Sequence, residues 1–188
     1  MTKKLKITEL NEAYQKVINW FFAFSTKEIG LSDLAEAVNI SKTTANKVVN
    51  QLVQEGFLNL EVLGKIWRIS CNQKHQYNTT RKIAFNLTKV YESRIIEKIH
   101  KTIKNPKAII LFGSYRKGDD TEESDIDIAI EVFDNKDLKI TELEIPKLGY
   151  RKNIKINLHI FSRNKIDLNL FSNIANGIIL EGFLEVKP

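Results

Sequence analysis

The sequence of 188 residues predicts an α+β protein with two domains, and three features support this prediction. Apolar residues recur at helical spacing three times before residue 56, and two short strand-like segments follow. A polar stretch without periodicity then occupies residues 73–78. Beyond residue 107 the chain contains short apolar runs of the kind that buried strands show. We therefore expect one domain at residues 1–72, a second at residues 79–188, and a linker between them.

The first domain is expected to begin with three helices. Apolar spacing predicts a helix over residues 8–24 and a second, shorter helix with Ser32 as its N-cap. Ser41 is expected to cap a third helix, and Gly56 provides the residue type that commonly follows a helix end.

A β-hairpin is expected to follow these helices. Residues 57–62 and 66–69 have strand-like composition and flank a short turn that contains Gly64. This order of elements, together with the run SDLAEAVNISKTTANKVVNQLVQEGFL, resembles the winged helix-turn-helix domains of prokaryotic transcription regulators over residues 8–70. The resemblance implies that the third helix is a recognition helix, that the hairpin is the wing, and that the protein regulates transcription.

The third helix has the composition expected of a helix in the major groove of DNA. From residue 41 to residue 54 the chain has two lysines and no acidic residue, so no carboxylate would repel phosphates. Its exposed side can offer cations and hydrogen-bond donors to phosphates and base edges. Double-stranded DNA is therefore the expected partner, and docking of another protein is the alternative. The expected DNA-binding residues are Lys42, Thr43, Thr44, Asn46, Lys47, Asn50 and, on the wing, Lys65.

The second domain is expected to contain a long helix and a small sheet. Apolar residues at every fourth position predict a helix over residues 79–104, which Asn105 and Pro106 end. Its apolar strip could be buried within one chain or could join two protomers in a homodimer. Strands are expected at residues 109–112, 124–130 and 154–161, and a closing helix and turn at residues 168–183.

Acidic residues are concentrated at positions 119–127, where the chain has six of them and no basic residue. Asp125 and Asp127 alternate with isoleucines, so both side chains should leave the same face of a strand, roughly 6.5 Å apart at their Cα atoms. Two carboxylates at this spacing can bind a hard divalent cation. Without a cation, a basic partner or solvent would have to compensate for their burial.

Composition and spacing exclude several other kinds of protein and site. A single cysteine, Cys71, and three scattered histidines exclude a disulfide scaffold and a structural zinc site. A Walker loop fails because Gly118 is followed by two aspartates, and an EF-hand fails because no glycine or further ligand lies near Ala129. The chain shows no signal peptide and no run of about 20 apolar residues, so we expect a cytoplasmic protein without a membrane partner.

The run LFGSYRKGDDTEESDIDIAI resembles the polymerase-β-type nucleotidyltransferase superfamily, close to its minimal prokaryotic members. Its Gly-Ser pair is followed about ten residues later by Asp-hydrophobic-Asp, and the resemblance covers residues 80–183. It implies a small mixed sheet flanked by helices, with Mg²⁺ or Mn²⁺ at Asp125 and Asp127 and a nucleoside triphosphate as substrate. The residues expected near the nucleotide are Gly113, Ser114, Arg116 and Ser124, of which Arg116 is either a triphosphate clamp or a surface arginine.

One position departs from the pattern of this superfamily. A third carboxylate is expected on a later strand, where this chain has Asn157, and an amide cannot act as a general base. His159 is two residues further along the same strand face and is either a replacement base or a structural residue. Two functions follow. The protein either transfers a nucleoside monophosphate to a hydroxyl of a protein, nucleic acid or small molecule, or it is a regulator with a degenerate nucleotidyltransferase fold that senses nucleotides or mediates assembly.

Overall fold

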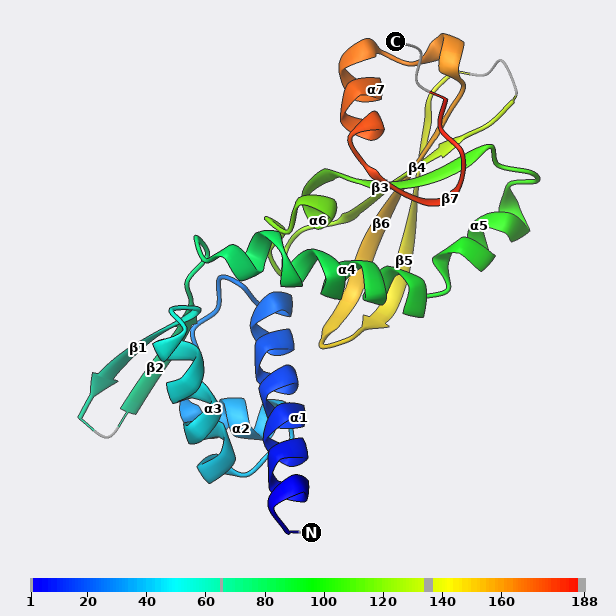
Figure 1. The fold of residues 1–188 in the computed structure, drawn as a ribbon. Helices are drawn as coiled ribbons and strands as arrows, with labels where there is room; N and C mark the ends of the chain where they lie inside the picture. Colours follow the sequence, from blue (N-terminus) through cyan, green and yellow to red (C-terminus); the bar gives the residue numbers. More distant parts are fainter. Residues whose placement is uncertain (1, 65, 134–136, 186–188) are drawn as a thin grey trace. The chain divides into compact units, whose positions relative to one another are not determined.

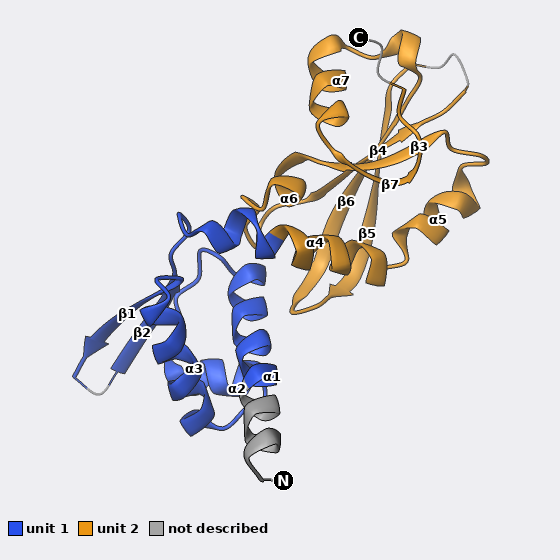
Figure 2. Ribbon diagram, viewed as in Figure 1, with its two compact units in different colours: residues 1–82 blue, residues 83–188 orange. Residues whose placement is uncertain are grey.

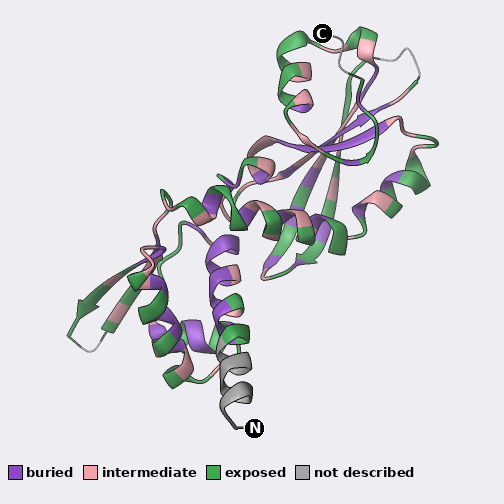
Figure 3. Cartoon of the chain, in the orientation of Figure 1, coloured by how far each residue is buried: buried purple, intermediate pink, exposed green. Residues whose placement is uncertain are grey.

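The computed structural model describes residues 2–64, 66–133 and 137–185, with the backbone alone for residues 2–10. The chain divides into two compact units, residues 1–82 and residues 83–188 (Figure 2). Each unit has its own buried core, which alternates with exposed positions along the helices and strands (Figure 3). In the described part of the chain, no helix combines the length and the apolar character needed to cross a membrane.

The first unit consists of three helices and a two-stranded antiparallel sheet, in the order expected. These elements are α1 (Thr2–Ala23), α2 (Leu31–Ala37), α3 (Lys42–Gln54), β1 (Leu58–Leu63) and β2 (Ile66–Cys71). Ser41 caps α3 as predicted, because its hydroxyl accepts a hydrogen bond from the Thr44 amide at 3.1 Å. Gly56 follows the helix with a left-handed φ of 79°.

Three details of this unit differ from the sequence prediction. Helix α1 begins at Thr2 rather than near residue 8, and Gly30 rather than Ser32 is the N-cap of α2. The boundary between the two compact units falls after residue 82, and residues 73–78 lead into a 3₁₀ turn of the first unit. Within this stretch Asn78 is buried, and its amide donates hydrogen bonds to the carbonyls of Asn72 and His75. Satisfied local hydrogen bonds hold this segment in place without an apolar pattern.

The second unit is built around one mixed five-stranded sheet (Figure 1). The strand order is β5-β6-β4-β3-β7, with β4 and β6 parallel and the other neighbouring pairs antiparallel. The strands are β3 (Ala108–Phe112), β4 (Ile126–Glu131), β5 (Lys139–Leu148), β6 (Arg151–Phe161) and β7 (Ile178–Gly182). The helices are α4 (Arg81–Glu92), α5 (Ile95–Thr102), α6 (Gly113–Lys117) and α7 (Leu168–Ala175). The structure also has two short 3₁₀ turns in its described residues, η1 (Gln76–Thr79) in the first unit and η2 (Arg163–Lys165) in the second.

The long helix predicted over residues 79–104 is interrupted, and that prediction is wrong. Arg94 adopts a left-handed conformation with φ of 55° between α4 and α5. The neighbouring Ser93 hydroxyl donates a hydrogen bond to the Val90 carbonyl at 2.6 Å and accepts one from the Ile95 amide at 3.2 Å. A serine that bonds to nearby backbone groups competes with helical hydrogen bonds, and it ends α4 here. Much of the predicted apolar strip packs within the second unit, where Ile95 and Ile99 are fully buried.

The two faces of the sheet are covered by different helices, in agreement with strand alternation. On one face Ile109 and Leu111 of β3 pack in a core with residues of α4 and α5. On the other face Ile110 and Phe112 of β3 pack with Ile174 of α7. Strand β4 alternates in the same way, so its isoleucines lie in the first core, whereas Ala129 lies in the second. The odd-numbered positions of β4 and β6 therefore belong to the face that α7 covers.

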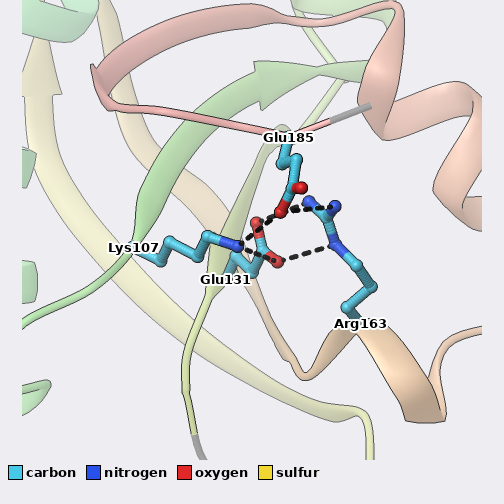
Figure 4. Close-up of polar contacts among 4 residues, drawn as sticks. All are labelled: Lys107, Glu131, Arg163 and Glu185. Atoms are coloured by element: carbon cyan, nitrogen blue, oxygen red, sulfur yellow. Dashed lines mark hydrogen bonds and ion pairs between the residues drawn. The ribbon is translucent and has the colours of Figure 1, made fainter. Parts of the chain in front are cut away.

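At the carboxyl end of β4 an ion cluster ties together segments that are far apart in the sequence (Figure 4). Glu131 is 2 % exposed and accepts two hydrogen bonds from Arg163, at 3.0 and 3.2 Å. Lys107 lies 3.5 Å from the same carboxylate, and Glu185 lies 3.7 Å from both cations. Because a buried carboxylate is costly without partners, these cations stabilise Glu131 and hold the segment after β7 against the sheet.

Candidate active site

The candidate site begins where β3 meets α6, at Gly113. This residue has a left-handed φ of 74°, which glycine adopts without steric cost. A Cβ atom built on Gly113 would lie 2.5 Å from Oδ2 of Asp127, so the carboxylate rests directly against the glycine backbone. The absence of a side chain at position 113 thus lets the Gly-Ser turn and the acidic strand approach each other.

Two neighbouring parallel strands bring the carboxylates together with Asn157. Asp127 on β4 pairs in register with Asn157 on β6. The Asn157 amide nitrogen donates to Asp127 Oδ1 at 3.2 Å and lies 3.4 Å from Asp125 Oδ2. Both carboxylates therefore converge on one amide group, on the face of the sheet that α7 covers. This convergence agrees with the alternation predicted for the strand.

His159 lies two residues further along β6, on the same face of the sheet. Its Nε2 atom is 3.4 Å from Asp127 Oδ1, and its ring packs edge-on against Phe112 with the ring centroids 5.0 Å apart. Its other ring nitrogen, Nδ1, is buried and has no hydrogen-bond partner among the described residues. The nitrogen available to the site is therefore Nε2.

The surroundings of Asp127 favour its ionised form. Hydrogen bonding to His159 lowers the pKa of this carboxyl group, burial opposes that effect, and the Asn157 amide lowers the pKa further. Asp127 is consequently a carboxylate at neutral pH, which is the form that a cation or a phosphate-bound metal requires.

The donor set fits a hard divalent cation such as Mg²⁺. Carboxylate oxygens are the ligands such a cation prefers, and those of Asp125 and Asp127 lie within 3.4 Å of the same amide nitrogen. No group of three or more His, Cys, Asp or Glu side chains that could hold a metal forms within the described ranges. Mg²⁺ in nucleotide sites is commonly held by one or two carboxylates together with substrate phosphates, so two carboxylates suffice for such a site.

The other residues predicted near the nucleotide border the same turn and the following loop. Ser114 and Arg116 lie on α6, and both side chains are half-buried. The Ser124 hydroxyl is engaged locally, because it accepts a hydrogen bond from the Thr121 amide at 3.0 Å. Gly113 thus lies against Asp127 and Ser114 follows it on α6, whereas the Ser124 hydroxyl braces the loop that leads to the acidic pair.

The predicted DNA-binding residues belong to the first unit and lie mainly on one exposed helix face. Lys42, Thr43, Lys47 and Asn50 of α3 are exposed, and Thr44 and Asn46 are half-buried. Asn50 donates a hydrogen bond to the Asn46 side chain, and Lys65 lies outside the described residues. The described cation of the hairpin, Arg68, forms ion pairs with Glu28 and Glu61.

Sequence reasoning missed three buried polar residues next to this site. Asn86 and Asp120 are 1 and 3 % exposed, and Arg151 is 8 % exposed. Asp120 is one of six acidic residues at positions 119–127, and Asn86 and Arg151 stand in segments whose pattern gives no signal for burial. Only their contacts in the folded chain identify them.

Comparison with known proteins finds a matching family model and similar proteins. The family model described as "Polymerase beta, Nucleotidyltransferase" matches residues 94–181. Two relatives from Methanocaldococcus jannaschii are named "Putative protein adenylyltransferase MJ1215" and "Putative protein adenylyltransferase MJ0128". The first is 42 % identical over 62 residues, which are 32 % of this chain and 67 % of the relative. The second is 47 % identical over 49 residues, which are 26 % of this chain and half of the relative.

Proposed function

This chain belongs to the polymerase β nucleotidyltransferase family, and on that premise we propose that it transfers AMP from ATP to a hydroxyl group of a protein. The observation that carries the proposal is the convergence of Asp125 and Asp127 beside the Gly113 turn. The names of the two relatives support a protein acceptor and ATP as the donor.

In this reaction the acceptor oxygen bonds to the α-phosphorus of ATP, the bond from that phosphorus to the β-phosphate oxygen breaks, and pyrophosphate leaves. We propose that Asp125 and Asp127 would hold a Mg²⁺ ion, which when bound neutralises phosphate charge as the new bond forms. The left-handed turn at Gly113 keeps the Asp127 carboxylate against the backbone at the start of α6. Ser114 follows this turn and supplies a hydroxyl and a backbone amide next to the phosphates.

The acceptor hydroxyl must lose its proton, and Asn157 cannot take it because an amide is not a base at neutral pH. The nearest nitrogen base is His159, whose Nε2 atom faces Asp127 Oδ1 at 3.4 Å. We propose that this atom takes the proton in the tautomer that carries the ring hydrogen on Nδ1, which requires its contact with Asp127 to open when the nucleotide binds. Asn157 instead donates its amide hydrogens to the carboxylates and orients them.

The proposal is tested by incubating the full chain with Mg²⁺, a protein extract and ATP labelled in the α-phosphate, and separately with ATP labelled in the γ-phosphate. We expect protein-bound label from the α-phosphate only, and its loss in Asp127→Ala. Glu123→Ala is the matched control, because Glu123 is an exposed acid of the same loop. Label from the γ-phosphate, or α-label that persists in Asp127→Ala, contradicts the proposal.

A second proposal concerns the first unit, which we infer binds double-stranded DNA through α3. The exposed face of this helix carries Lys42 and Lys47, and the whole helix has no acidic residue. Among the described residues, Arg68 of the hairpin is paired with two glutamates, so we assign the described phosphate contacts to Lys42 and Lys47 of α3. The salt dependence of DNA binding tests this assignment, as described in the Discussion.

A further inference from the structure

Next to the candidate site lie four buried residues whose polar groups contact the loop after α6, and we call them the loop anchor. Asn86 comes from α4, Tyr115 from α6, Asp120 from the loop that follows α6, and Arg151 from the start of β6. They are 1, 3, 3 and 8 % exposed, respectively. Burying polar groups is costly unless hydrogen bonds compensate, so the contacts of these residues indicate what the cluster stabilises.

The first part of the anchor holds the beginning of the loop at residues 118–124. The Asn86 amide nitrogen donates to the Tyr115 carbonyl at 2.9 Å and to Asp120 Oδ1 at 2.7 Å. A single amide group thereby joins the helix that starts at Gly113 to the first part of the loop. Because Asn86 belongs to a different element, it fixes both against α4.

The second part of the anchor holds the end of the same loop. Arg151 Nη2 donates to the Ser124 carbonyl at 2.5 Å. Ser124 immediately precedes Asp125, so this hydrogen bond acts on the backbone at the first carboxylate of the site. A hydrogen bond from a charged donor is stronger than a neutral one, particularly when it is buried.

Between these two attachments the loop is braced by its own hydrogen bonds. The Gly118 amide donates to the Ser114 carbonyl at 2.9 Å, and the Thr121 amide donates to Ser124 Oγ at 3.0 Å. The loop therefore links the Gly-Ser turn to the acidic pair through a short, hydrogen-bonded path. The two ends of the loop therefore set the distance between the Gly-Ser turn and the acidic pair.

The charges of Asp120 and Arg151 both affect the pKa of the Tyr115 hydroxyl. Burial raises the pKa of Tyr115, the negative charge of Asp120 raises it further, and the positive charge of Arg151 lowers it. Arg151 Nη1 and Asn86 Oδ1 have no hydrogen-bond partner among the described residues. The hydrogen bond to the Ser124 carbonyl is the contact through which the guanidinium acts on the loop.

From these contacts we infer that Arg151 and Asn86 are positioning residues for nucleotidyl transfer, which fix the Gly-Ser turn and the acidic pair at the separation that binds a nucleoside triphosphate. The inference rests on the proposed function for the reaction that this placement serves. Supporting residues matter because a misplacement of about 1 Å in a catalytic group can cost about 100-fold in rate.

Hydrogen–deuterium exchange of the full chain tests the placement directly. In Arg151→Met and Asn86→Ala, amides of residues 118–127 should exchange about tenfold faster or more, because a bond to a charged or buried group is lost. Arg151→Lys, which keeps the charge, should recover part of the protection. The matched controls are Lys152→Met and Thr88→Ala, exposed neighbours on the same elements, which should exchange as the wild type does.

A second readout separates positioning from general stability. Calorimetric titration with Mg²⁺ and ATP, below the unfolding temperature of each variant, should show affinity weakened about tenfold or more in Arg151→Met and unchanged in Lys152→Met. Unchanged exchange at residues 118–127, or a lower unfolding temperature with unaltered affinity, would overturn the inference. If the wild type itself binds no ATP, the proposed function fails, whereas the exchange result still decides whether Arg151 fixes the loop.

Discussion

Replacing Gly113 by alanine should disable the site while leaving the fold intact. The new methyl group would lie 2.5 Å from Asp127 Oδ2 and 3.3 Å from Asp127 Cγ. An ordinary contact needs about 3.5 Å, so the carboxylate must move by roughly 1 Å. A displacement of that size in a catalytic group can reduce the rate about 100-fold, which corresponds to about 2.7 kcal/mol in the activation barrier.

The same substitution also costs stability, because alanine is strained at a φ of 74°. That cost is about 1–2 kcal/mol and applies to any glycine in the left-handed region. Gly64→Ala is the matched control, since Gly64 has φ of 63° and no atom within 4 Å of the added Cβ. Both variants should unfold at lower temperature, and only Gly113→Ala should lose transfer of α-labelled phosphate, measured below both unfolding temperatures. Equal activity of the two variants would refute the reasoning.

Three further predictions concern the first unit. Burial raises the pKa of Cys71 to about 11, so this thiol should react with a disulfide reagent at pH 8 only after urea unfolds the chain; rapid reaction of the native chain would contradict its burial. Lys42→Ala combined with Lys47→Ala should weaken DNA binding and reduce its salt slope by about two, whereas an unchanged slope would discard α3 as the binding helix. Burial raises the pKa of Glu55, but hydrogen bonds, of which the one from Tyr14 is the strongest, outweigh this effect and lower the pKa from its usual value of 4.5. The ionised carboxylate therefore stabilises the fold near neutral pH. Glu55→Gln should be less stable than the wild type near neutral pH, and the difference should shrink as the pH falls below 4.5.

The candidate site was predictable because strand alternation is a local property. A period of two places Asp125 and Asp127 on one face, and the structure brings Asn157 to them by pairing β4 with β6 in parallel. The same alternation accounts for His159, which follows Asn157 by two residues.

Features that depend on single backbone conformations or on distant contacts were not predictable. The apolar period continues from α4 into α5, and only the left-handed Arg94 with its Ser93 hydrogen bonds divides the helix. Strand β5 was not predicted, and it contains Pro146, which is tolerated because β5 lies at the edge of the sheet. Asn86 and Arg151 are 65 residues apart in sequence, and no local pattern signals that both attach to one loop.

The most direct test of the central claim is calorimetric titration of the full chain with ATP, in the presence and absence of Mg²⁺. The account predicts binding that depends on Mg²⁺ in the wild type and is lost in the double variant Asp125→Ala, Asp127→Ala, with the fold of that variant confirmed by circular dichroism. Glu123→Ala should bind as the wild type does. Binding of ATP that is equally strong without Mg²⁺, or that survives removal of both carboxylates, would contradict the assignment of the acidic pair as the metal and nucleotide site.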